Sequence, residues 1–375
     1  MNWQPFSQIR LRRVLTLAGV CGLLAAASCS TAPVRDRTGG GDTRPVAPSA
    51  PPVERAPSAT LQRLADEAVA LTPMSRSSLS ARFLAATRSL PPVASRTVYM
   101  NEVSREYFSP AAKANLPAAA QSKLAEVTLD EYRYYYTKYG SPLAYMRPLD
   151  LVYAQGFTDT GGKLIADLGY GGIGHLRLLA SLGAHVTGID PDSYLSALYS
   201  ERQDQGNVPP ARDARRGATG SITLAHGFWP KDAKMIERVG QGFDLILSKN
   251  TLKKGYVKPE RKIDKRQMVE LGVSDEVFLK TVFNTLNPGG MLMIYNISPK
   301  QQEKGYNPQA DGRSPYTREQ YEKAGFTVLA YNTGDDAAVR DMGRALRWDR
   351  NAKDEVSDLE GSLFAMYTLV RRPGR

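Results

Sequence analysis

A glycine-rich turn between an apolar run and a helical pattern constrains the fold of this chain more than any other feature. The run ends at Asp167, the turn is Gly169-Tyr-Gly-Gly-Ile-Gly174, and the helical pattern follows directly. With Gly171, the glycines have the spacing G-x-G-x-x-G, which lets a nucleotide-like ligand approach the backbone. Asp190 ends the next apolar run, where a carboxylate accepts hydrogen bonds from ribose hydroxyls. The sequence therefore predicts a nucleotide-like ligand over the ends of these two strands.

Strand-like and helical patterns alternate from residue 161 onward. Apolar runs predict strands at 163–167, 184–190, 221–225, 243–248, 291–295, 326–330 and 363–370. Helical patterns are clearest at 175–182, 275–286 and 317–324. This alternation predicts an α/β fold in which residues 156–375 form a doubly wound, seven-stranded, mostly parallel sheet. The ligand of such a sheet lies outside the carboxyl ends of its strands.

The region before the sheet, 61–155, is rich in helical patterns and predicts an N-terminal helical cap. Apolar residues recur at helical spacing from Leu61 to Leu71, and prolines interrupt the pattern near position 91. Further helices are expected over 118–139 and 143–152. The first of these contains a cluster of tyrosines, which we expect to pack in the core, with a ligand pocket as the alternative.

The N-terminus has the layout of a bacterial export signal. Three arginines between positions 10 and 13 precede an apolar stretch, 14–27, that is shorter than the roughly 20 residues needed to span a bilayer. The following Ser-Cys pair resembles a lipobox, in which the cysteine is lipidated. Residues 1–28 are therefore predicted to be a signal peptide, and Cys29 to anchor the protein to a membrane on the periplasmic side of the cell envelope.

A segment rich in proline and glycine, 29–60, is predicted to be a disordered linker that tethers the folded body. Three alternatives to lipidation remain open. The signal could be cleaved without lipidation, or it could stay as an uncleaved anchor. A later start at Met74 or Met100 would instead give a cytoplasmic protein.

Composition argues against two classes of protein. The chain has two cysteines, Cys21 and Cys29, and three histidines, so neither a disulfide framework nor a Cys- or His-rich metal site is expected. Lys and Arg together number 49 against 38 Asp and Glu, and the net charge of +11 suits an acidic partner. Nucleic acid is not expected as the partner, because it does not suit an envelope location.

An ordered set of motifs resembles the class I S-adenosylmethionine-dependent methyltransferases. Their first motif is an acid, one residue and Gly-x-Gly, as in Asp167-Leu-Gly-Tyr-Gly171. Gly188-Ile-Asp-Pro191, the Asn-Pro-Gly-Gly turn that ends at Gly290, and the Ala-Gly-Phe that ends at Phe326 match later motifs. The resemblance covers residues 161 to 372. It implies S-adenosylmethionine as cofactor and methyl transfer as activity.

The resemblance assigns the cofactor site residue by residue. The positions that match the family or face its cofactor are Asp167, Gly169, Tyr170, Gly171, Gly172, Gly174, Asp190, Pro191, Phe228 and Ser248. Two departures are visible. Ile173 stands where the family has a third glycine. No acid follows the third strand, so Phe228 or Trp229 is expected to stack on the adenine.

The fourth strand runs into a strongly basic segment. Residues 249–266 carry a net charge of +6 beside the expected reaction site. They predict either an electrostatic funnel for an anionic envelope acceptor or a solvated face. Lys249, Asn250 and His226 follow strand ends and are the candidates for catalysis.

Two other functions remain open at this stage. A non-catalytic envelope lipoprotein could keep this fold as a binding module, which would explain an exported protein whose expected cofactor is made in the cytosol. An NAD(P)-dependent oxidoreductase would also use a glycine turn, but such enzymes usually have an apolar residue at the position of Asp167.

Overall fold

The computed structural model describes residues 58–374, apart from 138–139, 213, 215–218, 265–266, 302 and 352–353. The predicted signal peptide, Cys29 and the linker as far as residue 57 lie outside the described residues. The first helix, α1 (Ala59–Leu71), begins where the linker was predicted to end, and the Ser58 hydroxyl caps it by accepting from the Leu61 N–H at 3.2 Å. In the described part of the chain, no helix combines the length and apolarity needed to cross a membrane.

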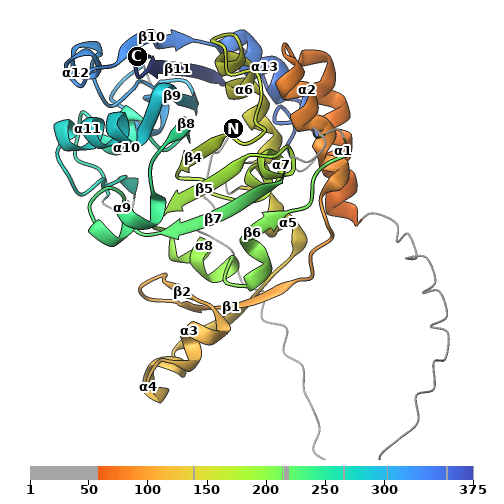
Figure 1. Cartoon of the computed structure of the whole chain (residues 1–375). Helices are drawn as coiled ribbons and strands as arrows, with labels where there is room; N and C mark the ends of the chain where they lie inside the picture. Colours follow the sequence, from red (N-terminus) through yellow and green to blue (C-terminus); the bar gives the residue numbers. More distant parts are fainter. Residues whose placement is uncertain are drawn as a thin grey trace, which may run out of the picture. The chain divides into compact units, whose positions relative to one another are not determined.

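An eight-stranded sheet forms the centre of the α/β region (Figure 1). Its strand order is β10-β11-β9-β8-β4-β5-β7-β6. In chain order the strands are β4 (Leu164–Leu168), β5 (His185–Asp190), β6 (Gly206–Val208), β7 (Gly220–His226), β8 (Phe243–Lys249), β9 (Leu286–Ser298), β10 (Thr327–Gly334) and β11 (Phe364–Arg371). The predicted doubly wound, mostly parallel sheet is confirmed, because the five strands from β9 to β7 pair in parallel.

The strand count differs from the predicted seven. The additional strand is β6, which pairs antiparallel with the edge of β7. Its three residues are too few to show an alternating pattern in the sequence. The strand order reverses between β4 and β8, and a crevice for ligands is expected at such a switch point.

Helices cover both faces of the sheet and enclose two apolar cores. One core is built with α6 (Met146–Tyr153), α7 (Gly174–Ser181), α8 (Ser193–Leu198) and α13 (Asp336–Ala345). The other is built with α9 (Ala233–Val239), α11 (Asp275–Thr285) and α12 (Arg318–Lys323). Strand β4 shows the division, since Ile165 belongs to the first core and Ala166 and Leu168 to the second. Both faces are buried, which explains the continuous apolar runs in the sequence.

The N-terminal region is mixed rather than purely helical. Helix α1 and helix α2 (Ser78–Ala85) agree with the prediction, as does α6. The predicted helix over 118–139 is wrong, because this tract contains α4 (Ala118–Gln121), β3 (Leu124–Leu129) and α5 (Glu131–Tyr135). β3 pairs along its length with β1 (Arg96–Asn101), and this long-range pairing outweighs the local pattern.

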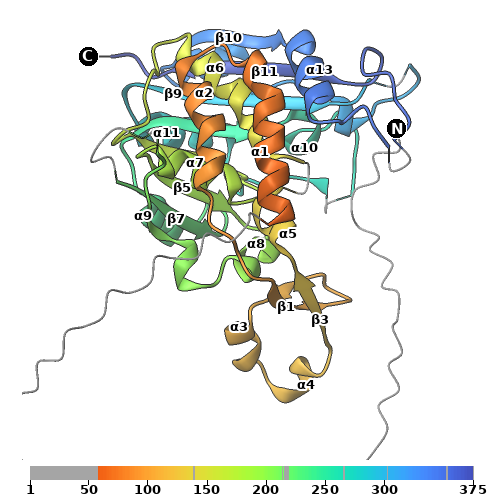
Figure 2. The ribbon, with the colours of Figure 1, turned by 90° about the vertical axis from the view of Figure 1, so that its right-hand side faces the viewer.

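A small three-stranded sheet results, in the order β2-β1-β3, with β2 (Tyr107–Phe108) at one edge. Figure 2 shows β1 and β3 leading away from the larger sheet, with α3 (Pro110–Ala114) and α4 beyond them. The small sheet contacts the α/β region mainly through α8.

Candidate functional site

The first two glycines of the turn adopt left-handed backbone conformations. Gly169 has a φ of 73° and Gly171 a φ of 58°, a region that favours glycine. A Cβ atom on Gly169 would stand 2.0 Å from Oγ1 of Thr251, in the loop after β8. A Cβ atom on Gly171 would meet nothing nearer than 3.8 Å, apart from its chain neighbours. A Cβ atom on Gly171 would therefore be in ordinary van der Waals contact, whereas one on Gly169 would clash with the chain itself.

The next two glycines pack against the N-terminal region. A Cβ atom on Gly172 would lie 3.1 Å from the carbonyl oxygen of Tyr136, and one on Gly174 would lie 2.3 Å from that of Tyr135. Close packing by the chain is therefore sufficient to explain both glycines. Their predicted contact with a cofactor remains a prediction.

Asp190 lies beside the turn at the carboxyl end of β5. The Gly171 N–H donates to its Oδ2 at 3.4 Å, and the Asp192 N–H donates to its Oδ1 at 2.9 Å. The side chain is partly exposed, and the adjacent Pro191 is exposed. This is the placement that the ribose-binding role requires: a carboxylate at a strand end, next to a glycine turn.

His226 is the Cα partner of Asp190 across the β5–β7 pair. Both of its ring nitrogens are buried and have no hydrogen-bond partner in the described chain. Burial, with a smaller contribution from Arg238, lowers the pKa of His226 to about 4, so the ring is neutral at physiological pH. The Tyr170 ring, 6.3 Å from it, is fully buried, and its hydroxyl also has no partner there. Buried polar atoms without partners are rare in proteins.

The polar groups of the expected cofactor can be compared with these unpartnered atoms. A nucleoside brings hydroxyl groups and base nitrogens, which can pair with the unpartnered atoms of His226 and Tyr170 and approach the partly exposed carboxylate of Asp190. The donor set at the ends of β5 and β7 therefore fits an adenosine moiety.

The neutral state of His226 leads to a prediction about acid stability. A histidine with a folded-state pKa near 4 takes up fewer protons between pH 6.5 and 4 than it does in the unfolded chain. The free energy of unfolding should therefore fall as pH decreases through this window, by about 1.4 kcal/mol per pH unit for each such group. His175, whose pKa is also lowered by burial, adds to the effect.

The measurement is urea denaturation at several pH values. His226→Asn should reduce the slope between pH 6.5 and 4 and leave the free energy above pH 7 nearly unchanged. An unchanged slope in His226→Asn would contradict the buried, neutral state of this ring.

Asp167 is completely buried at the end of β4 and binds two aromatic side chains. Its Oδ2 accepts from the Tyr145 hydroxyl at 2.7 Å and lies 2.6 Å from Nε2 of His175. The Tyr145 and His175 rings stack with centroids 3.7 Å apart. Burial raises the pKa of Tyr145, and the Asp167 charge raises it further. Oδ1 of Asp167 has no partner within the described chain, so this carboxylate retains capacity for a donor.

Lys249 ends β8 next to this cluster. Its Nζ lies 5.5 Å from the centroid of the Tyr145 ring. Burial lowers its pKa to about 8, and the attraction of Asp167 partly opposes that shift. A lysine with this pKa is part neutral near pH 8 and can then accept a proton.

Asn250 has a structural role. Its φ of 62° turns the chain, its N–H donates to the Tyr295 carbonyl at 3.1 Å, and its Oδ1 accepts from the Ile297 N–H at 2.7 Å. Asn250, one of the three catalytic candidates, thus anchors the loop after β8 to β9. Lys249 and His226 are three strands apart, about 14 Å at the usual strand spacing, so they do not form one catalytic pair.

The remaining predicted cofactor residues differ in accessibility. Phe228 is 48% exposed and available to a ligand, whereas Trp229 is buried against Phe278 with ring centroids 6.0 Å apart. Trp229 is therefore a core residue. Ser248 is buried, and its Oγ accepts from the Leu252 N–H at 3.1 Å, which stabilises the loop after β8.

The structure divides the basic segment into paired and unpaired cations. Lys254 pairs with Glu260 at 2.7 Å, and Lys258 pairs with Asp275. Arg261 and Lys262 instead line an open cavity of about 500 Å³. A second cavity of about 220 Å³ lies between the N-terminal region and α13, and neither cavity is lined by the glycine turn.

Three residues of this region were missed from the sequence. Tyr145 follows a run typical of a core helix, Thr251 has no motif, and Lys253 was one cation among many. Lys253 is buried and bonded to backbone carbonyls, and burial lowers its pKa to about 7. Only tertiary contacts distinguish these side chains. No cluster of three or more potential metal ligands occurs among the described residues.

The strand order and the glycine turn define a doubly wound α/β fold. No family model matches the chain, and no curated protein sequence matches it. Among solved structures, the [4+2]-cyclase SpnF is 16% identical, with a TM-score of 0.37 over 61% of this chain and 81% of that one. A putative sarcosine dimethylglycine methyltransferase from Galdieria sulphuraria is 14% identical, with a TM-score of 0.36 over 63% and 88%.

Phosphoethanolamine N-methyltransferase 2 of Haemonchus contortus, solved in complex with S-adenosyl-L-methionine, is 13% identical, with a TM-score of 0.33 over 74% and 68%. Several of the similar structures are thus methyltransferases, and some of them are described as dependent on S-adenosylmethionine or contain it.

Proposed function

We propose that this chain is an S-adenosylmethionine-dependent methyltransferase whose cofactor lies over the carboxyl ends of β4 and β5. The observation that carries the proposal is the hydrogen bond from the Gly171 N–H to Asp190, at the strand end next to the unpartnered nitrogens of His226. Asp190 would hold the ribose hydroxyls. The free Oδ1 of Asp167 would face the positively charged amino acid end. When bound, the cofactor supplies a methyl group on a sulfonium.

Lys249 is the residue that we propose handles the proton of the acceptor. Its Nζ forms no ion pair with the described residues, its pKa is lowered to about 8 by burial, and it lies at the end of β8, beside Asp167 and Tyr145. In the neutral form Nζ accepts a proton from the acceptor's nucleophilic atom, which frees the lone pair that attacks the methyl group.

The pH dependence of the reaction tests this role. We expect kcat/KM to rise with pH up to about 8 and then level off, because Lys249 must be neutral to accept the proton. Lys249→Met should lower kcat by about 100-fold or more and remove this step from the profile. Lys254→Met, which changes an ion-paired lysine in the same segment, should keep the parent profile. A step near pH 8 that survives in Lys249→Met would assign the proton transfer to another group.

The proposed cellular setting follows from the N-terminal sequence. We propose that the protein is exported and tethered through lipidated Cys29 to a membrane, on the periplasmic side of the cell envelope. Its acceptor is then an envelope compound, and the basic segment after β8 supports an anionic one.

One observation favours a second candidate, a binding module without catalysis. Thr251 packs directly on Gly169, and stacked Tyr145 and His175 already occupy one oxygen of Asp167. A protein that kept the fold but lost methyl transfer could tolerate these side chains in the crevice beside the glycine turn.

Calorimetric titration of the purified full-length chain tests both candidates. We expect S-adenosylmethionine to bind and NAD to show no binding. Binding followed by methylation of an envelope extract supports the enzyme, and binding without turnover on any extract supports the module. If only NAD binds, the methyltransferase assignment is wrong and an oxidoreductase takes its place.

A further inference from the structure

The cavity of about 500 Å³ lies on the same edge of the sheet as Lys249, in the segments that follow β8 and β9. Its volume is within the range of small-molecule sites, about 300–1,000 Å³. Its polar lining consists of Arg261, Lys262, Asp264, Gln267, Asn307 and Gln309. It is therefore a hydrogen-bonding site with more positive than negative side chains.

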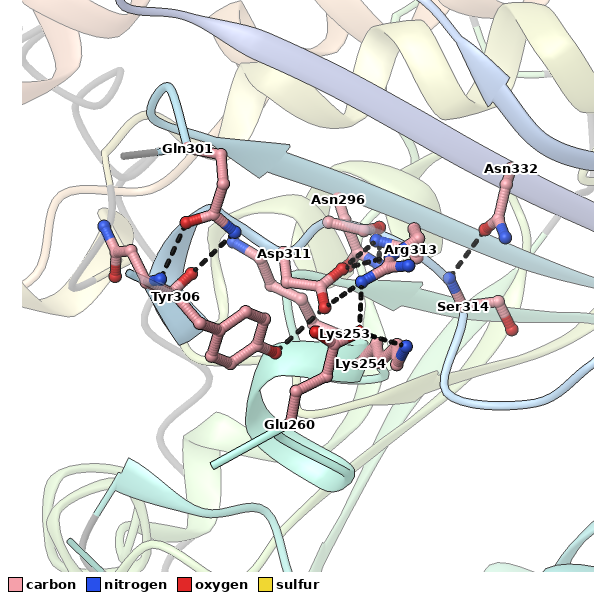
Figure 3. A network of polar contacts seen from close by, with 12 residues as sticks. Lys253, Lys254, Glu260, Asn296, Gln301, Tyr306, Asp311, Arg313, Ser314 and Asn332 are labelled. Atoms are coloured by element: carbon pink, nitrogen blue, oxygen red, sulfur yellow. Dashed lines mark hydrogen bonds and ion pairs between the residues drawn. The ribbon is translucent and has the colours of Figure 1, made fainter. Parts of the chain in front are cut away.

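The two lining cations have no counter-ion among the residues that the structure describes. Glu260, the neighbouring carboxylate, pairs with both Lys254 at 2.7 Å and Arg313 at 2.8 Å (Figure 3). For Arg261 and Lys262, no ion pair or side-chain hydrogen bond is found among the described residues. The cavity's own carboxylate, Asp264, is itself engaged in an interaction. Arg261 and Lys262 can therefore offer their charge to a ligand at this cavity.

The wall of the cavity formed by residues 307–309 is held in place by contacts with residues 253–255. The buried Nζ of Lys253 donates to the Gln309 carbonyl at 2.6 Å and to the Ile297 carbonyl at 3.1 Å. The chain packs so closely here that a Cβ atom on Gly255 would stand 1.7 Å from the Pro308 carbonyl oxygen. Figure 3 shows the adjoining network around Asp311 and Arg313, which form an ion pair of 2.7 Å. A site whose walls are fixed in advance loses less conformational entropy when a ligand binds.

We propose that this cavity binds a phosphomonoester, the anionic group of the methyl acceptor. Arg261 offers a planar fork of N–H donors that fits phosphate oxygens, and Lys262 adds a second positive charge next to it. Two cations without counter-ions match a group whose charge approaches −2 at neutral pH. The side-chain amides of the lining provide further donors to its oxygens. Binding of the phosphate is independent of the proposed function, but its role as part of a methyl acceptor rests on that function.

The test is calorimetric titration of the full-length chain with glycerol 3-phosphate at constant ionic strength, with glycerol as the uncharged control. We expect glycerol 3-phosphate to bind and glycerol not to bind. The double variant Arg261→Gln/Lys262→Gln should weaken binding at least 10-fold. The matched variant Arg88→Gln/Lys123→Gln removes the same charge from exposed positions elsewhere and should keep the parent affinity.

A second arm distinguishes a soluble phosphomonoester from a lipid headgroup. Vesicles of phosphatidylcholine are compared with vesicles that also contain phosphatidic acid, which carries a phosphomonoester. Either probe supports the site if its binding depends on Arg261 and Lys262, and the stronger of the two identifies the source. The proposal would be overturned if both double variants lost affinity to the same extent, or if neither probe bound.

Titration of the same samples with S-adenosylmethionine separates this inference from the proposed function. If the cofactor binds and the phosphomonoester does not, the cavity proposal is wrong and the methyltransferase proposal stands. If the phosphomonoester binds and the cofactor does not, the site exists, but its ligand is not a methyl acceptor.

Discussion

Asp190→Ala is expected to weaken the binding of S-adenosylmethionine by about 100-fold. The carboxylate would accept two hydrogen bonds from the ribose, and charge-assisted bonds contribute about 1.5 kcal/mol each or more. Their loss totals about 3 kcal/mol, which corresponds to about 100-fold in the dissociation constant. Its position next to Gly171 at the end of β5 makes Asp190 the best-placed carboxylate for this role.

The measurement is calorimetric titration of the full-length chain with S-adenosylmethionine. Because Asp190 also accepts from the Asp192 N–H, the variant could disturb the local turn, so Asp190→Asn is measured alongside as a shape-preserving change. Asp232→Ala is the matched control, since Oδ1 of Asp232 accepts from the Lys234 N–H at the same 2.9 Å and two-residue spacing. Affinity within about threefold of the parent in Asp190→Ala would contradict the ribose-binding role.

Arg96→Met is expected to lower the free energy of unfolding by about 3–5 kcal/mol, the usual cost of leaving a buried charge without its partner. Arg96 joins β1 to the α/β region by two hydrogen bonds to Asp204, at 2.6 and 2.9 Å, and the Asp204 side chain is fully buried. Tyr134 donates to the same carboxylate at 2.8 Å, and Arg177 approaches it only to 4.0 Å.

Urea denaturation measures the decrease in the free energy of unfolding. The double variant Arg96→Met/Asp204→Leu should recover part of the stability, because replacing both charges by apolar groups removes the uncompensated ion. Arg88→Met, at an exposed position, should change the free energy of unfolding by less than about 0.5 kcal/mol. A loss below 1 kcal/mol in Arg96→Met would mean that Arg177 or water compensates Asp204.

Local sequence patterns predicted the secondary structure correctly in the elements whose burial follows a regular strand or helix period. The seven predicted strands overlap the strands of the sheet, and the Asp167-to-Gly174 turn lies between β4 and α7. Helix α11 was predicted at 275–286 and spans Asp275–Thr285, where Ser274 caps its first turn. In these elements, apolar periodicity and turn residues reflect the same burial that the fold produces.

Long-range contacts decided the elements that local patterns misrepresent. Leu124, Val127 and Leu129 have helical spacing, yet they belong to β3, since the pairing partner is β1, far away in the sequence. The chemistry of the site shows the same limit. His226 and Lys249 both follow strands, but which strands are neighbours is not encoded in either residue.

The sequence by itself determined the class of fold, the position of the glycine turn and the carboxylate that faces it, because these depend on local periodicity and on backbone conformations that glycine favours. Only the tertiary structure decided which charged side chains have a partner within the chain and which can contact a ligand. In the folded chain Glu260 forms two ion pairs, and buried Lys253 donates to backbone carbonyls. Arg261 and Lys262 line a cavity. The reason is physical: a charge acts on a ligand only if no nearer partner in the folded chain neutralises it, and that partner is set by packing.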